Sequence, residues 1–264
     1  MPYAFCPKCS HAPLPEDQVL PAACPACGLI LAKYGAAPIR RLSLERVERG
    51  ISEAQIGAKR GWLATWLLHV PDEVARTNWI ARIATLAVLL FWTLWIWRDA
   101  DIRAGETGSN FLHMILLPFH EAGHYAIFRW FGQFIMILGG TLGQHLMPIV
   151  LGAALLIKRR DPFGAAIFFW LLGFSTIDMA VYMYDAFDPQ LTLLGGSTGA
   201  ESDGHDWQNI FGDLGLLRRA RGIGLFFGWV GKTMMLAALL WAAWVLRLQR
   251  ARLSDSLFTE SDIT

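Results

Sequence analysis

The chain has 264 residues, of which 54% are hydrophobic and 17% are charged, and its formal net charge is +1. A net charge this close to zero gives no strong field to attract a polyanion, so we expect no nucleic-acid partner. The hydrophobic residues gather in long runs after residue 78, and the part before them is polar, charged and rich in proline. This asymmetry predicts a small soluble head followed by a multi-pass membrane domain. No apolar run opens the chain, so we expect no signal peptide.

All four cysteines lie in two CxxC turns, Cys6-Pro-Lys-Cys9 and Cys24-Pro-Ala-Cys27. Each turn presents two thiolates, and two turns complete a tetrahedral metal site. With the following Gly-Leu-Ile, the pattern resembles a zinc ribbon over residues 1–35, although Ser10 stands where glycine is common. Two disulfides are the alternative, which a reducing compartment disfavours. We expect a structural zinc ion in a cytoplasmic module that docks a protein partner, since four thiolates leave no position for water.

Residues 36–77 form a charged connector between the head and the membrane domain. Its interspersed arginines, lysines and glutamates predict a solvated helix. The segment 61–68 is apolar but too short to span a bilayer. Its tryptophans favour a place at the membrane interface, and a place in the core of the soluble head is the alternative.

The membrane domain, residues 78–250, contains apolar runs long enough to cross a bilayer. Four runs meet this length: Trp79–Trp97, Asn110–Trp130, Pro162–Tyr184 and Gly222–Leu246. A fifth, Phe134–Ile157, is apolar but broken by Gly139-Gly140, Gly143 and Pro148. We predict an all-α polytopic membrane protein with four spanning helices, one spanning or re-entrant segment, an N-terminal zinc ribbon and a disordered tail over 251–264.

The order of these runs raises a question of topology. If all five span, Lys158-Arg159-Arg160 lies opposite the basic connector, against the positive-inside rule. If Phe134–Ile157 re-enters on the same side, then Arg129, residues 158–160 and the C-terminal arginines all face the cytoplasm. We favour the re-entrant version, which also keeps the cysteines in a reducing compartment.

The motif His120-Glu121-Ala-Gly-His124 lies within the apolar run Asn110–Trp130. On a helix, its two histidines are one turn apart on the same face and can hold one zinc ion, while Glu121 acts as the base that takes a proton from water. Three ionisable groups in an apolar segment are costly and imply a function. A pair of hydrogen-bonded core histidines with a buried glutamate is the non-functional alternative.

A catalytic zinc site needs a third protein ligand. Asp178 is the only charged residue within Pro162–Tyr184, so we predict it as the ligand, with Tyr182 or Asp185 in support. A hydrogen-bonded contact between helices is the alternative for Asp178. The other candidate ligands are His145 beside the glycines of the broken run, and His205 and Asp206 in the Gly-rich loop 195–207.

Two further features accompany these candidates. The loop 195–207 is either a lid over the site or an ordinary surface loop. His113 lies two turns before His120 on the same helical face, where it lines a water path, supports a ligand or does neither. The glycines 139, 140 and 143 predict irregular backbone that binds substrate or polarises its carbonyl.

An HExxH helix, then a Gly-broken segment, then a helix with one buried Asp resembles the site-2 protease family of intramembrane zinc metalloproteases. The resemblance covers residues 110–184. It implies that His120, His124 and Asp178 bind zinc and that Glu121 activates water. The context of Asp178 departs from the family, which has Leu-Asp-Gly where this chain has Ile177-Asp178-Met179.

These observations predict a zinc-dependent peptidase that cleaves membrane-associated protein substrates within the lipid bilayer, with one catalytic and one structural zinc ion. The alternative is a non-catalytic metal-binding membrane protein, a sensor, scaffold or transporter, that recruits a partner through the zinc ribbon. The presence of Glu121 favours the enzyme, because a purely structural metal site does not need that carboxylate. A soluble-type metalloprotease anchored by helices is excluded by the apolar flanks of the motif.

Overall fold

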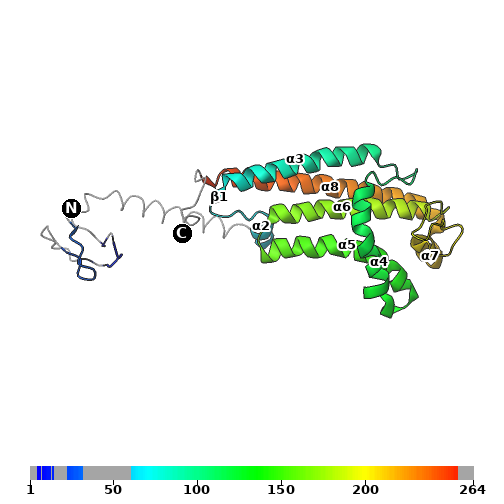
Figure 1. The fold of residues 1–264 in the computed structure, drawn as a ribbon, viewed down its shortest axis with the longest axis horizontal. Coiled ribbons are helices and arrows are strands. Elements are labelled where there is room, and N and C mark those ends of the chain that lie inside the picture. The colour runs from blue at the N-terminus through cyan, green and yellow to red at the C-terminus, as the bar shows by residue number, and fades with distance from the viewer. Residues whose placement is uncertain (1–4, 7, 13, 15–22, 32–60, 255–264) are drawn as a thin grey trace. The chain divides into compact units, whose positions relative to one another are not determined.

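The structure is a computed structural model that describes residues 5–6, 8–12, 14, 23–31 and 61–254. The chain divides into two compact units, Met1–Gly61 and Trp62–Thr264. The solvated helix that we predict within residues 36–60 and the tail 255–264 lie outside the described residues. The second unit is almost entirely helical (Figure 1).

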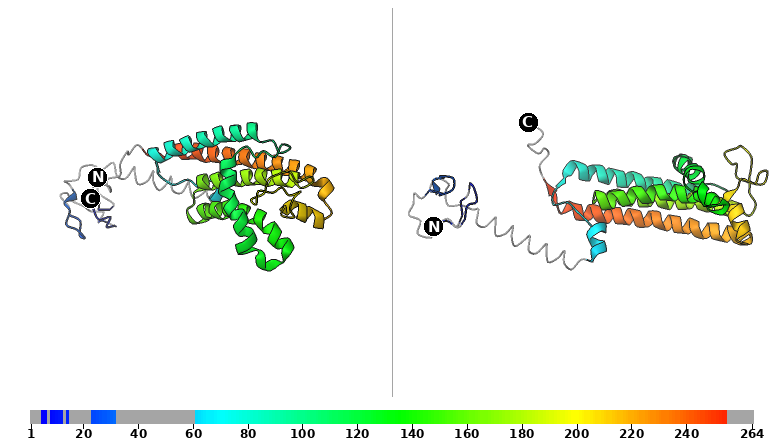
Figure 2. Two further views of the ribbon diagram at one scale, coloured as in Figure 1. Left: turned by 45° about the vertical axis from the view of Figure 1, so that its right-hand side comes forward. Right: turned by 90° about the horizontal axis from the view of Figure 1, so that it is seen from below.

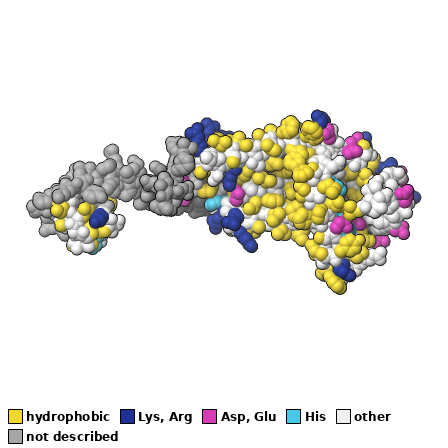
Figure 3. Space-filling view, in the orientation of Figure 1, with side chains coloured by type: hydrophobic (Ala, Val, Ile, Leu, Met, Phe, Trp, Pro, Cys, Tyr) yellow, Lys and Arg dark blue, Asp and Glu magenta, His cyan; other side chains and the backbone are white. Residues whose placement is uncertain are grey.

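Four helices of the second unit are long and apolar enough to cross a membrane: α3 (Arg76–Asp99), α5 (Gln133–Lys158), α6 (Pro162–Asp185) and α8 (Ala220–Arg250). They lie side by side in both views of Figure 2. Figure 3 shows many apolar side chains on the outer surface of the helical unit. Phe91 of α3, Val150 of α5 and Trp229 of α8 are among the exposed large hydrophobic residues. A broad exposed apolar surface of this kind is expected of helices that face lipid.

Helix α6 is the centre of the bundle and packs most closely against α8. A Cβ added at Gly173 would lie 2.9 Å from the carbonyl oxygen of Gly231, and one added at Gly231 would lie 2.6 Å from that of Gly173. Small residues at the crossing therefore let the two backbones approach, as is typical of membrane helices. Trp170 of α6 also donates a 2.7 Å hydrogen bond to the hydroxyl of Thr93 in α3.

The prediction that Asn110–Trp130 forms one spanning helix is wrong. Helix α4 covers only Asn110–Ala122, and a π-helix, η2 (Gly123–Ile127), and a 3₁₀ turn, η3 (Arg129–Phe131), follow it. Pro118 lies inside α4, and Gly132 with φ +91° ends the segment. Helix α4 continues through Pro118, and its regular hydrogen-bond pattern ends at Gly123, where the π-helix begins. Helix α4 crosses α5 and α6 instead of running beside them (Figure 1).

The predicted re-entrant course of residues 134–157 is also wrong, because α5 is continuous over 26 residues. Gly139, Gly140 and Gly143 stay helical and pack against α4 and η2. A Cβ at Gly143 would collide with the carbonyl oxygen of Phe119. Glycine here allows close contact between helices, and the irregular backbone that we predict at these glycines is not present.

One end of the bundle is closed by short elements. The helix α2 (Trp62–Leu67) lies here, and the indole of Trp241 donates a 2.8 Å bond to the carbonyl of Leu67. Strand β1 (Val74–Ala75) pairs in parallel with β2 (Leu253–Ser254). Residues 253–254 are therefore ordered, against the predicted disorder of 251–264. Residues 62–67 belong to the helical unit, so the alternative that places 61–68 in the core of the head is wrong.

Candidate metal centres

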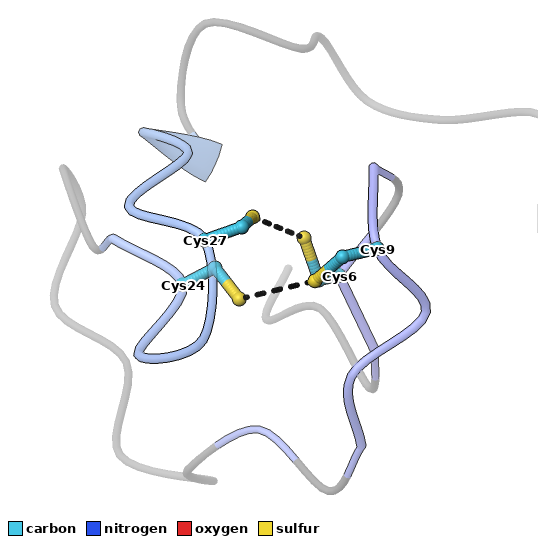
Figure 4. A group of neighbouring side chains, drawn as sticks. All are labelled: Cys6, Cys9, Cys24 and Cys27. Atoms are coloured by element: carbon cyan, nitrogen blue, oxygen red, sulfur yellow. Dashed lines mark hydrogen bonds between the residues drawn. The ribbon is translucent and has the colours of Figure 1, made fainter.

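The four cysteines of the N-terminal unit converge as the CxxC pattern predicts (Figure 4). The Sγ atoms of Cys6 and Cys27 lie 3.6 Å apart and those of Cys9 and Cys24 lie 3.7 Å apart, and all four thiols are free. A tetrahedron of sulfurs about 2.3 Å from zinc has edges of about 3.8 Å. The spacing therefore fits one metal ion and excludes disulfides among the four.

The turns that carry these cysteines are built by their own backbone bonds. The N–H of Ser10 donates to the carbonyl of Cys6 at 2.9 Å, and the N–H of Gly28 donates to that of Cys24 at 2.8 Å. Ser10 and Gly28 both have positive φ, 60° and 70°. Glycine adopts this conformation freely and serine does so at some cost, so Ser10 completes the knuckle although glycine is common there.

The second candidate centre begins with the HExxH motif at the end of α4. The imidazoles of His120 and His124 lie with ring centroids 4.8 Å apart, as the one-turn spacing predicts. His124 lies within the π-helix η2, and His120 lies two residues before the end of α4. π-helical turns are frequent at functional sites because they redirect side chains within a helix.

The third member of this group is Asp206, at the first position of α7 (Asp206–Asp213). Its Oδ2 lies 3.0 Å from Nε2 of His120 and 3.2 Å from Nε2 of His124. Ligands about 2.0–2.1 Å from zinc in a tetrahedron are about 3.3 Å apart, so the three atoms fit one ion. Without a metal ion, protonated Nε2 atoms of the two histidines donate hydrogen bonds to Asp206; burial alone would raise the pKa of Asp206, but these bonds hold it below the usual value.

Asp178, our predicted third ligand, does not join this group. Its Oδ1 lies 2.8 Å from Nδ1 of His113, and the side chain is 7% exposed. Of the alternative ligands, the structure brings Asp206 to the histidines. His145 instead contacts the carbonyl oxygen of Thr141 through Nδ1 at 2.8 Å. A carboxylate therefore does complete the group with the two histidines, as we predict. It belongs to Asp206, which follows His124 by 82 positions in the sequence, and not to Asp178.

Contacts of the Nδ1 atoms of His120 and His124 fix the orientation of the two imidazole rings. Nδ1 of His124 lies 2.8 Å from the carbonyl oxygen of Met136, which can only accept, so this nitrogen carries a proton. Nδ1 of His120 lies 2.9 Å from Oε1 of Gln144, whose amide nitrogen donates to the carbonyl of Ser175 at 3.2 Å. In the neutral rings both Nε2 atoms then present lone pairs toward Asp206, an arrangement that a cation stabilises.

A second layer of contacts positions Asp206. The hydroxyl of Tyr182 accepts the backbone N–H of Asp206 at 3.2 Å. His205, fully buried, caps α7 by accepting the N–H of Gln208 through Nδ1 at 3.0 Å, and its Nε2 lies 3.2 Å from Oδ2 of Asp185. Tyr182, Asp185 and His205 are therefore near the centre as supports, and the structure does not bring them to the ligand position. The loop before α7 carries the ligand itself.

Glu121 lines the same cavity as the three ligands, a space of about 830 Å³. Helices α4, α5 and α6 and the loop that precedes α7 all contribute to its walls. Gly195 and Ser197 of the loop 195–207 also line the cavity. The cavity therefore holds the carboxyl group of Glu121 together with a group that could bind a metal ion.

Two residues of this site are absent from our sequence-based prediction, Gln144 and Met136, and Gly140 has a different role from the predicted one. A Cβ added at Gly140 would lie 2.5 Å from Nε2 of His120 and would also collide with His124. Gln144 is a lone amide in an apolar run, which is a signal that the sequence offers. Gly140 and the carbonyl of Met136 give no such signal, because their roles depend on how α5 packs against α4.

No protein-family model, no curated protein and no solved structure matches this chain. The class of the protein therefore comes from its own features: a helical unit with four candidate membrane spans, a group of two histidines and an aspartate, and a separate four-cysteine group.

Proposed function

We propose that this protein is an intramembrane zinc-dependent peptidase of the HExxH type, which hydrolyses peptide bonds of membrane-associated proteins. The observation that carries the proposal is the convergence of His120, His124 and Asp206 beside Glu121 in one cavity. A structural metal site does not need a free carboxylate next to its ligands, whereas peptide hydrolysis needs a base there.

The donor set fits zinc, since two imidazole nitrogens and one carboxylate oxygen leave one tetrahedral position open. Zinc bound there would supply a Lewis acid that polarises the peptide carbonyl and lowers the pKa of water. Glu121 takes the proton of the attacking water and later gives it to the leaving amine, so a C–O bond forms as the C–N bond breaks. Gln144 and the carbonyl of Met136 hold the imidazoles in one orientation throughout.

The experiment compares wild-type protein with Glu121→Gln, which keeps the size of the side chain and removes the base. Both are purified in detergent, loaded with zinc and incubated with a proteome-derived peptide library that mass spectrometry reads for new termini. New termini that appear with the wild type and not with the variant support the proposal. Equal sets of termini from the two proteins, or none from either, contradict it.

The charges of the helical unit support a topology with the basic end in the cytoplasm. Eight cationic residues lie at the end that α2 closes: Arg76, Arg82, Lys158, Arg159, Arg160, Arg247, Arg250 and Arg252. In the sequence, six more cationic residues lie between positions 40 and 60, before α2. The other end of the helical unit carries six arginines and many acidic residues. With four spans, residues 158–160 lie on the connector's side, which removes the conflict with the positive-inside rule.

Arg129 lies at the opposite end of α5 from Lys158, against its predicted cytoplasmic position. In this topology the N-terminal cysteine module, which precedes α2 in the chain, is cytoplasmic, where its thiols stay reduced and bind a structural zinc ion. The module then serves to dock a cytoplasmic protein. The peptidase site lies toward the end of the bundle that faces away from the cytoplasm.

A further inference from the structure

We infer that His113 and Asp178 form a substrate-binding subsite, in which the imidazole donates a hydrogen bond to a main-chain carbonyl of the bound polypeptide about three residues from the cleaved bond. This inference rests on the proposed peptidase function. It gives Asp178 a role that does not involve the metal centre.

The two residues form a pair with one buried and one accessible member. Asp178 projects from α6, and its side chain is 7% exposed, whereas that of His113 on α4 is 43% exposed. Both line the cavity that holds the HExxH residues. The bond between Nδ1 and Oδ1 is 2.8 Å long, and Nε2 of His113 has no hydrogen-bond partner among the residues that the structure describes. The pair therefore has a polar atom available to a ligand in the cavity.

The chemistry of the pair makes that atom a donor. An ionised carboxylate only accepts, so Nδ1 of His113 carries the shared proton. A buried carboxylate among apolar helices is costly unless a positive charge compensates it, which favours the imidazolium form. The hydrogen bond with Asp178 accordingly raises the pKa of His113, against the opposing effect of burial. In the imidazolium, Nε2–H points a charged donor at the cavity.

The distance to the metal centre suits an extended peptide. His113 precedes His120 by seven residues, which is about 10.5 Å along a helix at 1.5 Å per residue. An extended chain advances about 3.3 Å per residue, so about three residues bridge this distance. A substrate helix must unwind to be cleaved, and each freed carbonyl in an apolar environment then needs a donor. His113 meets that need at one position.

The test uses binding of zinc-chelating probes, because it requires neither an identified substrate nor turnover. Leucine hydroxamates, extended by zero to four further leucines on either side, are titrated into zinc-loaded full-length protein in detergent and followed by calorimetry. For each length, an alkene isostere (CH=CH for CO–NH) removes the terminal carbonyl, and an ester analogue keeps the carbonyl but removes the N–H. Affinity that is lost in the alkene analogue but kept in the ester analogue therefore reports a hydrogen bond that this carbonyl accepts.

In probes extended on one of the two sides, the analogue with the alkene at about the third residue should bind about tenfold more weakly than the parent amide probe. The ester analogue at the same position should bind about as tightly as the amide probe. His113→Phe should abolish this difference, and His113→Gln should restore part of it through its amide N–H. Asp178→Asn keeps an acceptor for Nδ1–H of His113 but removes the negative charge. His113 then becomes neutral and its Nε2 becomes an acceptor, so the difference in affinity between the alkene and amide probes should again vanish. His69→Phe, outside the cavity, is the matched control.

The outcomes separate the two levels of the proposal. If the unextended hydroxamate binds every variant equally and the carbonyl effect is lost as described, the subsite is supported. If the unextended probe binds but no position shows a carbonyl effect, or the effect survives in His113→Phe and Asp178→Asn, the subsite is overturned and the peptidase site stands. If the unextended probe fails to bind the zinc-loaded wild type, the proposed metal centre itself fails.

Discussion

Replacing Gly140 by alanine should remove the metal from the histidine centre. The added Cβ would lie 2.5 Å from Nε2 of His120 and would also collide with the ring of His124. Carbon atoms make their best non-bonded contacts at about 3.5–4.0 Å, so the rings must retreat by about 1 Å. Metal ligands tolerate displacements of only about 0.2 Å, which is about one-fifth of that shift.

The magnitude follows from what such shifts do to metal sites. Loss of a partner that only orients a ligand lowers metal affinity about 10–100-fold, and here two ligands move together. We therefore expect at least a 100-fold loss of zinc affinity. Zinc content of the purified protein, measured by mass spectrometry, should fall from about two ions per chain to about one.

The matched control is Gly222→Ala, in the first turn of α8. Apart from its chain neighbours and the backbone of its own helical turns, no atom of the described residues lies within 4 Å of a Cβ built there. Alanine in a helix is favoured over glycine by about 0.5–1 kcal/mol, so this variant should keep both zinc ions and its thermal stability. If Gly140→Ala binds two zinc ions with wild-type affinity, the position assigned to the metal between the two rings is wrong.

The other predictions concern ligand identity and topology. Asp206→Asn should lower zinc affinity of the histidine centre at least tenfold, whereas Asp178→Asn should leave zinc content unchanged; the opposite result would restore Asp178 as the ligand. Cys24→Ser should lower zinc content by one ion per chain, and unchanged content would refute the four-thiolate site. A periplasmic-type phosphatase reporter inserted at Gly196 should be active and one fused to the C-terminus inactive; reversed activities would invert the topology.

Local patterns in the sequence were sufficient for several features. The helical, multi-span character of residues 78–250 follows from the length of the apolar runs, and the structure has four helices that meet this criterion. The approach of the two cysteines within each CxxC turn, and of His120 to His124, follows from the spacing of the motifs, because a turn or a single helical turn fixes both geometries. Each of these features depends on residues close together in the chain.

Which apolar runs form membrane-spanning helices cannot be predicted from composition alone. Composition does not distinguish a helix that crosses the bilayer from one that ends before it has crossed. The glycines in 134–157 predict a break in this segment, yet α5 is one continuous helix that includes them. Helix α4 packs against these same glycines. The run from Asn110 is apolar enough to span, but the π-helix that begins at Gly123 ends its regular part. Whether a glycine breaks a helix or admits a neighbour depends on whether a neighbour is present.

The third member of the histidine centre was decided by tertiary structure alone. Asp178 and Asp206 are both carboxylates that follow the motif, and Asp178 has the more suggestive position within a span. The loop after α6 turns back so that the first residue of α7 meets the histidines, while His113 engages Asp178. The sequence by itself determined which kinds of ligand were available. Only the packing of α4, α6 and α7 determined which carboxylate reaches the two rings, because a contact across 86 residues depends on the whole path of the chain between them.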